Sequence, residues 1–260
     1  MANDKLTELL SLMERLRSPD GCPWDREQTF QSLIPFLIEE AYEVVEALEL
    51  EDDGKLQEEL GDLLFQIVFF AQMAKEKGWF EMKDIISASH DKMVRRHPHV
   101  FGDKPAKNAK EALSSWQAMK EKEKVRDKKA SIFVEVPHQL PAIMRAQKIT
   151  EKASKVGFDW DNVADILKKV EEEIGEFKDA LKKGEKIQIE EELGDTLFAM
   201  VNLGRFLEID VEHSLRKATN KFVARFDYIT ENIEKKKDIT KASLEEMEEL
   251  WKEAKANLKR

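Results

Sequence analysis

One acidic and apolar stretch is written twice in this chain, as EELGDLLFQIV at residues 58–68 and as EELGDTLFAMV at residues 191–201. A second acidic motif precedes each copy, IEEAYEVVEAL at residues 38–48 and EEEIGEFKDAL at residues 171–181, and each contains Glu-Glu-x-x-Glu. The acidic positions pair at a constant offset of 133 residues: Glu39 with Glu172, Glu40 with Glu173, Glu43 with Glu176, Glu59 with Glu192, and Asp62 with Asp195. This regularity indicates an internal duplication.

Basic and aromatic positions repeat as well. CPWD at residues 22–25 matches FDWD at 158–161, KMVRR at 92–96 matches KFVAR at 221–225, and Trp116 matches Trp251. The segment between the halves contains a short β-prone patch and prolines that interrupt helical spacing. We therefore expect one domain at residues 1–125, a linker at 126–137 and a second domain at 138–260.

Composition and periodicity predict an all-α fold built of tandem helical bundles. Glycine and proline are scarce, at 10 and 7 of 260 residues, while Leu, Lys, Glu and Ala dominate. Apolar residues recur at helical spacing, and breaks at Gly54 and Gly184 separate the two acidic helices of each half. Ser243 and Glu246 have the spacing of a capping box, which predicts the start of a last helix.

Charge and the absence of targeting signals narrow the classes of function. A net charge of −10 argues against direct nucleic-acid binding, which depends on many Lys and Arg contacts. The single cysteine, Cys22, excludes an internal disulfide and disfavours a cysteine-based metal site. The first residues do not read as a signal peptide, and no apolar run is long enough to span a bilayer. We expect a cytoplasmic protein with no membrane partner.

The repeated acids have the spacing of a divalent-cation site. Residues three apart lie on one helical face, so Glu40 projects with Glu43, and Glu59 with Asp62. Four carboxylates at contact distance repel one another, and a hard cation relieves that repulsion. An all-oxygen ligand set suits Mg²⁺, or Mn²⁺ as a substitute, better than zinc. The same argument gives a second set: Glu173, Glu176, Glu192 and Asp195.

Two alternatives to a Mg²⁺ site need to be weighed: a solvated acidic face and a di-iron carboxylate site. A single Glu-Glu-x-x-Glu in a Glu-rich chain is usually a solvated face, but here paired motifs recur, embedded in apolar residues. A di-iron carboxylate bundle uses Glu-x-x-His ligand pairs, and none of the five histidines follows a candidate ligand by three residues. Gly61 and Gly194 lie between acidic ligands, where a glycine destabilises the helix. They indicate either a position where a partner backbone or a substrate comes close, or a packing glycine with no functional role.

A cation cluster with basic residues nearby points to a polyphosphate substrate. Lys221 and Arg225, four residues apart, are placed to neutralise phosphate charge, and Trp251 offers a flat face for a base. Lys92, Arg96 and Trp116 are their counterparts in the first half. Taken singly, such residues are more often a solvated pair and a core tryptophan.

Together, LIEEAYEVVEAL, QEELGDLLFQIVFFAQ, RRHPHVF, LPAIMRAQKI, VGFDW and EELGDTLFAMVNLGR resemble the bacterial MazG family of nucleoside triphosphate pyrophosphohydrolases, over nearly the whole chain. The resemblance implies the all-α NTP pyrophosphatase fold and hydrolysis of an NTP or dNTP to the monophosphate and pyrophosphate. It also implies dependence on Mg²⁺ and a homodimer. A role in clearing noncanonical nucleotides from the pool is one expectation.

The resemblance also assigns residues. It makes Glu173, Glu176, Glu192 and Asp195 catalytic metal ligands, with Glu40, Glu43, Glu59 and Asp62 as the metal ligands of the first half. The nucleotide contacts that it implies are Lys169, Glu172, Glu191, Lys221, Arg225 and Trp251. Glu172, beside the ligand Glu173, is our candidate for orienting the attacking water or accepting its proton.

The second half is expected to be the main catalytic one. Lys168 and Lys169, one turn before its acidic motif, are replaced at the 133-residue offset by Pro35 and Phe36. The first half should therefore hold polyphosphate less well, although its acids are all retained. Two alternatives stay open at this stage: a helical interaction or scaffold protein with structural metal sites, and a related dUTP or phosphoribosyl-ATP pyrophosphohydrolase.

Overall fold

A computed structural model describes residues 2–103, 105–123, 131–235 and 237–257, and within them it contains helices and no strand. The chain divides into two compact units, Met1–Val125 and Arg126–Arg260. The all-α tandem fold is confirmed. Residues 124–130, which include part of the segment expected to link the halves, lie outside the described residues.

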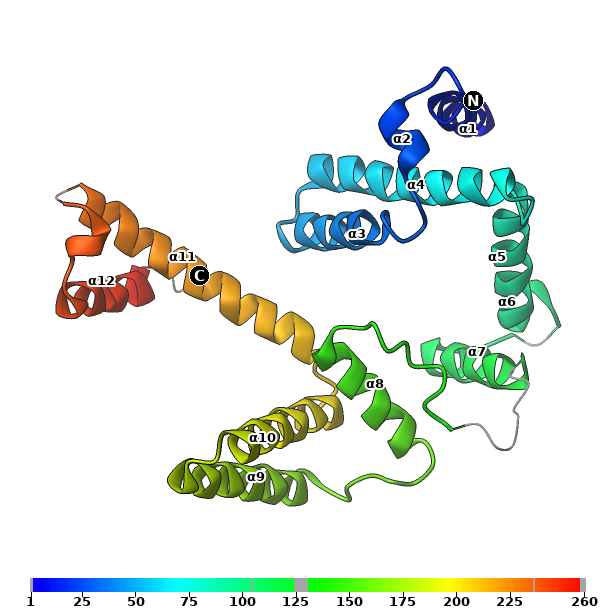
Figure 1. The fold of residues 1–260 in the computed structure, drawn as a ribbon. Helices are drawn as coiled ribbons and strands as arrows, with labels where there is room; N and C mark the ends of the chain where they lie inside the picture. Colours follow the sequence, from blue (N-terminus) through cyan, green and yellow to red (C-terminus); the bar gives the residue numbers. More distant parts are fainter. Residues whose placement is uncertain (1, 104, 124–130, 236, 258–260) are drawn as a thin grey trace. The chain divides into compact units, whose positions relative to one another are not determined.

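The first unit contains seven helices among its described residues. They are α1 (Ala2–Leu16), α2 (Pro23–Glu27), α3 (Ile34–Glu49), α4 (Asp53–Glu76), α5 (Met82–Arg96), α6 (Pro98–Phe101) and α7 (Ala109–Glu123). Helices α3 and α4 pack side by side as a hairpin, and α1 packs against α4 (Figure 1). Met13 of α1, Leu33 directly before α3 and Phe69 of α4 are buried in the core that these helices share.

The second unit repeats the hairpin with two helices of equal length, 21 residues each. Its elements are α8 (Ala142–Ser154), α9 (Val163–Lys183), α10 (Lys186–Phe206), α11 (Val211–Glu234), the short 3-10 turn η1 (Ile239–Lys241) and α12 (Leu244–Asn257). Helices α9 and α10 lie side by side, α8 packs on α10, and α12 packs on α11 (Figure 1). The hairpin carries the second pair of acidic motifs.

Local chemistry sets the ends of the acidic helices. The side chain of Asp52 accepts a hydrogen bond from the backbone N–H of Lys55 and caps α4, and Asn162 caps α9 in the same way. Gly184 ends α9 in the left-handed region, at φ 76°, where glycine carries no steric penalty. The break expected at Gly54 falls instead at residues 50–52, and Gly54 lies in the first turn of α4 because Asp52 supplies the cap.

Hydrophobic side chains remain exposed on the hairpin helices of both units. In the part of the chain that the structure describes, no helix has both the length and the apolar character that crossing a bilayer requires.

Candidate functional site

Three carboxylates converge in the second unit. Glu173 of α9 and Glu192 and Asp195 of α10 each offer an oxygen atom, and these atoms lie within 4.8 Å of one another. Glu173 is buried, at 7% exposure, while Asp195 faces solvent. The three come together because α9 and α10 are antiparallel neighbours and each turns one face toward the other.

Lys169 supplies the positive charge beside this cluster. Its Nζ lies 2.6 Å from Oε1 of Glu172 and 2.8 Å from Oε1 of Glu173, one helical turn away on α9. Hydrogen bonds to Glu172 and then to Glu173 raise the pKa of Lys169 well above its usual range, so this side chain stays charged. A fixed ammonium beside carboxylates that could hold a metal ion is the arrangement expected where a polyanionic ligand meets such an ion.

The carboxylates of this cluster repel one another, and the pKa of Glu192 reflects that repulsion. Burial raises the pKa of Glu192, and the negative charges of Glu176 and Asp195 raise it further. Glu176 is thus close enough to act on the cluster, although it lies outside the set of three oxygens within 4.8 Å. Such a site favours either a proton or a cation, because both relieve the repulsion.

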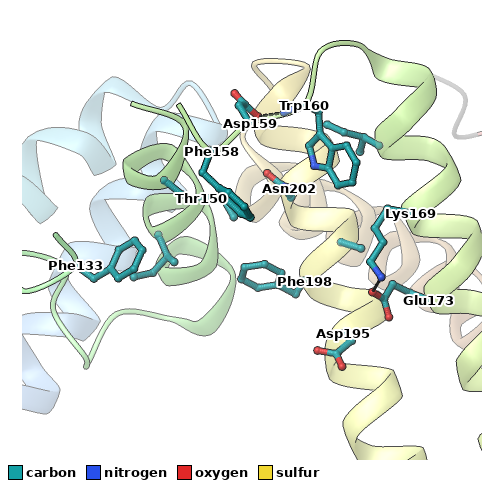
Figure 2. Close-up of a pocket in the computed structure, with 14 residues that line it drawn as sticks. Phe133, Thr150, Phe158, Asp159, Trp160, Lys169, Glu173, Asp195, Phe198 and Asn202 are labelled. Carbon is teal, nitrogen blue, oxygen red and sulfur yellow. Dashed lines mark hydrogen bonds and ion pairs between the residues drawn. The ribbon is translucent and has the colours of Figure 1, made fainter. Parts of the chain in front are cut away.

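A cavity of about 450 Å³ opens beside these carboxylates. Figure 2 shows Lys169, Glu173 and Asp195 together on one side of it and Asn202 on the other, with the Phe198 ring between them. The remaining lining is mainly apolar and aromatic and includes Phe133, Phe158, Trp160 and Ile166. Its volume falls within the roughly 300–1,000 Å³ typical of small-molecule sites.

The first unit contains a matching acidic cluster. Oxygen atoms of Glu40, Glu43 and Glu59 lie within 4.8 Å of one another, and Glu59 is buried. Burial raises the pKa of Glu40, and the negative charges of Asp62 and Glu43 raise it further, whereas a hydrogen bond from Gln66 lowers it. Asp62 is outside the closest three, as Glu176 is in the second unit, so each unit brings together a different three of its four expected ligands.

The remaining expected nucleotide contacts do not line the cavity of their own chain. Arg225 lies over the Trp251 ring at 5.4 Å, and Phe222 contacts the same ring at 5.2 Å, where α12 packs on α11. Lys221 is exposed one turn before Arg225. Glu191 is exposed on α10, and its charge adds to the rise in the pKa of Glu192. In the first unit, Arg96 lies over Trp116 at 5.5 Å in the same manner.

The glycines inside the acidic helices are not at crowded crossings within the chain. Apart from its chain neighbours and the nearby backbone of its own helix, a Cβ atom added at Gly61 or at Gly194 would meet no atom of the described residues within 4 Å. The expectation of close packing at these positions is therefore not met by the chain itself. Any close approach at Gly194 would have to come from a ligand or another molecule.

Comparison with known proteins agrees with this arrangement of two acidic hairpins. The family model of the MazG nucleotide pyrophosphohydrolase domain matches the chain twice, at residues 28–101 and 161–230. The chain belongs to the MazG family. The resemblance inferred from the motifs is confirmed, and the two matched segments contain both carboxylate clusters.

Curated nucleoside triphosphate pyrophosphohydrolases match this chain over nearly their whole length, and another curated relative matches it over about half of its own. A nucleoside triphosphate pyrophosphohydrolase/pyrophosphatase of Thermotoga maritima is 48% identical over 95% of this chain and 94% of its own. A nucleoside triphosphate pyrophosphohydrolase of Escherichia coli is 44% identical over 97% of both chains. An uncharacterised protein of Bacillus subtilis, YabN, is 43% identical over 96% of this chain and 51% of its own.

Part of the site in this MazG chain escaped the sequence analysis. Phe133 belongs to the segment expected to be a linker, and Asn202 is hidden in an apolar helical run, yet both line the cavity. Trp160 gave a signal, since it stands in the repeated FDWD motif, but nothing in the repeat placed it beside the carboxylates. The contribution of these residues depends on how α8, α9 and α10 pack.

Proposed function

We propose that this chain hydrolyses nucleoside triphosphates, ribo or deoxy, to the monophosphate and pyrophosphate, that it does so with Mg²⁺, and that the second unit carries the main active site. The observation that carries the proposal is the convergence of Glu173, Glu192 and Asp195 beside Lys169 at the rim of a nucleoside-sized cavity. Membership of the MazG family and the names of its near-full-length relatives support the reaction class. Clearing unwanted nucleotides from the pool is a fitting role.

The donor set fits the ion. Carboxylate oxygens within 4.8 Å of one another, with no histidine or cysteine in either cluster, are the ligands that Mg²⁺ and Mn²⁺ prefer. In the second unit, Glu173, Glu192 and Asp195 would hold it, with Glu176 next to them. When bound, such an ion polarises phosphoryl oxygens and lowers the pKa of water.

The protein's own groups then position the substrate. The Lys169 ammonium is fixed by Glu172 and Glu173, so its charge is aimed at the phosphates rather than free in solvent. Glu172 is 57% exposed and remains our candidate for orienting water or accepting its proton. The apolar walls of the cavity exclude water from the nucleoside side of the bond to be cleaved.

We also propose that the chain works as a homodimer. On α10, Leu193, Leu197 and Met200 form an apolar stripe at i, i+4 and i+7, and each is at least 46% exposed. The same stripe stands on α4, 133 residues earlier: Leu60, Leu64 and Ile67, each at least 39% exposed. Stripes of this kind, left open by the rest of the chain, are typical of helices that pack against another copy.

A second copy would also complete the site. Lys221, Arg225 and Trp251 lie outside the cavity of their own chain, so contact between them and a bound nucleotide requires another molecule. Lys221 and Arg225 of one protomer would then neutralise phosphates held by the other. Gly194, which has open space where a Cβ would be, lies beside Leu193 and leaves room for that approach.

Product analysis tests the proposal. Purified protein is incubated with a panel of canonical and modified nucleoside triphosphates, with Mg²⁺, with Mn²⁺ and with EDTA, and products are separated by ion-exchange chromatography. Monophosphate and pyrophosphate in equal amounts, lost in EDTA, support it. Release of single phosphate, or tight binding of helical partners with no turnover, contradicts it. Turnover of one nucleotide alone would favour a dUTP-type or phosphoribosyl-ATP-type relative.

A further inference from the structure

The far end of the cavity is lined by Asn202, whose amide group is held in a fixed orientation. Two of the three hydrogen-bonding nitrogen atoms of Arg205 donate to Asp159, at 3.0 and 2.5 Å, and its Nε donates to Oδ1 of Asn202 at 2.9 Å. A guanidinium only donates hydrogen bonds, so the amide oxygen of Asn202 must face Arg205. The amide NH₂ group is thereby turned the other way, and it donates to no residue that the structure describes.

The position of Asn202 relative to the carboxylates suits a nucleoside. Asp195, Phe198 and Asn202 follow one another on a single face of α10, two turns apart from end to end, which is about 10 Å of axial rise. Figure 2 shows the Phe198 ring between the acidic end and Asn202, and Trp160 near Asn202. A ligand with phosphates at Asp195 would thus have its base against Phe198 and Trp160, with its outer edge at Asn202.

The first unit lacks the polar residues that lie at the two ends of this cavity. At the 133-residue offset, Lys169 corresponds to Phe36, Asn202 to Phe69 and Arg205 to Gln72. Phe69 is 2% exposed in the core of that unit, and Phe36 packs edge-on against Trp24 at 5.9 Å. Side chains that line the cavity in one unit are thus replaced by rings packed within the other.

We propose that the cavity of the second unit receives the nucleobase and that the Asn202 amide donates a hydrogen bond to a keto oxygen on its edge. The site then favours bases with a keto oxygen at the purine 6-position or the pyrimidine 4-position, as in hypoxanthine, guanine and uracil, over adenine and cytosine, which present an amino group there. Two donors facing each other cannot pair, so the half-buried Asn202 amide would be covered by the base without gaining a hydrogen bond. This inference rests on the proposed function, because the phosphates must sit at Glu173 and Asp195.

Two pairs of substrates test the keto preference directly. ITP and ATP differ in keto against amino at the purine 6-position, and UTP and CTP differ in the same way at the pyrimidine 4-position. Pyrophosphate release by the wild-type full chain is expected to show kcat/KM about 10-fold higher for ITP than for ATP, carried mainly by KM, as loss of one neutral hydrogen bond implies. UTP should exceed CTP in the same sense.

Three variants assign the preference to Asn202. Asn202→Asp keeps an oxygen for Arg205 and replaces the NH₂ donor by an acceptor, so the preference for ITP should disappear or reverse. Asn202→Leu should lower kcat/KM for ITP about 10-fold and leave ATP little changed. Asn232→Leu, a partly buried amide on α11 that donates to the Tyr228 carbonyl, is the matched control and should keep the wild-type ratio.

Binding of IMP and AMP, measured by tryptophan fluorescence without divalent ions, separates the proposed hydrolase function from the proposed base-binding role of Asn202. If no triphosphate is hydrolysed but IMP binds more tightly than AMP and Asn202→Asp removes the difference, the proposed function fails and the base receptor stands. If triphosphates are hydrolysed with equal kcat/KM for ITP and ATP, or Asn202→Asp keeps the wild-type ratio at an unchanged melting temperature, the base receptor is overturned and the hydrolase stands.

Discussion

Removing the buried carboxylate of the second cluster should remove most of the turnover. Glu173 is 7% exposed, offers one of three oxygens within 4.8 Å, and accepts a hydrogen bond from Lys169. Removing one preorganised group that stabilises charge in a transition state costs about 2.7–4 kcal/mol in other enzymes. At 1.36 kcal/mol per factor of ten, Glu173→Ala should lower kcat/KM by about 10²- to 10³-fold.

The duplication supplies a matched control for this experiment. Glu40 occupies the equivalent position in the first unit, in a cluster of the same size, and Glu40→Ala should leave a substantial part of the turnover. Steady-state pyrophosphate release with Mg²⁺ compares the two variants, and circular dichroism shows that each is folded. A larger loss in Glu40→Ala than in Glu173→Ala would refute our assignment of the main site to the second unit.

Three further predictions follow from the clusters and the stripes. The pKa of Glu192 is raised above its ordinary value of 4.5, so the folded protein without metal ions loses stability as pH rises through that raised pKa. Because Mn²⁺ competes with the proton for the carboxylate, the rise in melting temperature on adding Mn²⁺ should be small near pH 4.5 and larger at pH 7. A rise independent of pH would contradict this. Gly194→Ala should raise the free energy of unfolding in urea by up to about 1 kcal/mol, because alanine favours a helix more than glycine does. If a second copy packs close to Gly194, as our dimer proposal expects, the same variant should also show weaker association and lower activity. Leu197→Lys places a charge in the apolar stripe and should shift light scattering toward the monomer and reduce turnover, while an unchanged dimer would place the interface elsewhere.

Local sequence rules predicted the helices well because each rule acts over a few residues. The capping box expected at Ser243 is present: its backbone N–H donates to Glu246 at 2.9 Å, and its hydroxyl accepts from the Glu246 backbone at 3.3 Å. Gly184 ends α9 as expected from its freedom to adopt positive φ. The Gly54 break was misplaced by a few residues because Asp52, a better cap, sets the start of α4.

The candidate site was predictable only in part, since it depends on contacts between helices. The i, i+3 rule placed the acids on shared faces, and the structure brings three of four together in each unit. It gave no reason why Asp62 in one unit and Glu176 in the other should stand slightly apart. Trp251, expected to face a base, packs on Arg225 because α12 lies along α11, and no pattern within either helix predicts that contact.

The two units share the carboxylate cluster but differ in the residues around it, and this difference indicates which of them limits catalysis. Both keep the acidic cluster and the apolar stripe, so ion binding and association alone do not distinguish them. What the first unit lacks is the cation Lys169 and the polar end of the cavity at Asn202, both replaced by phenylalanine. A triphosphate at the first cluster would therefore lack the ammonium that Lys169 supplies one turn before the acids of the second unit, and the amide that Asn202 presents there. Substrate binding energy in the transition state, rather than possession of a metal site, should therefore decide which unit turns over.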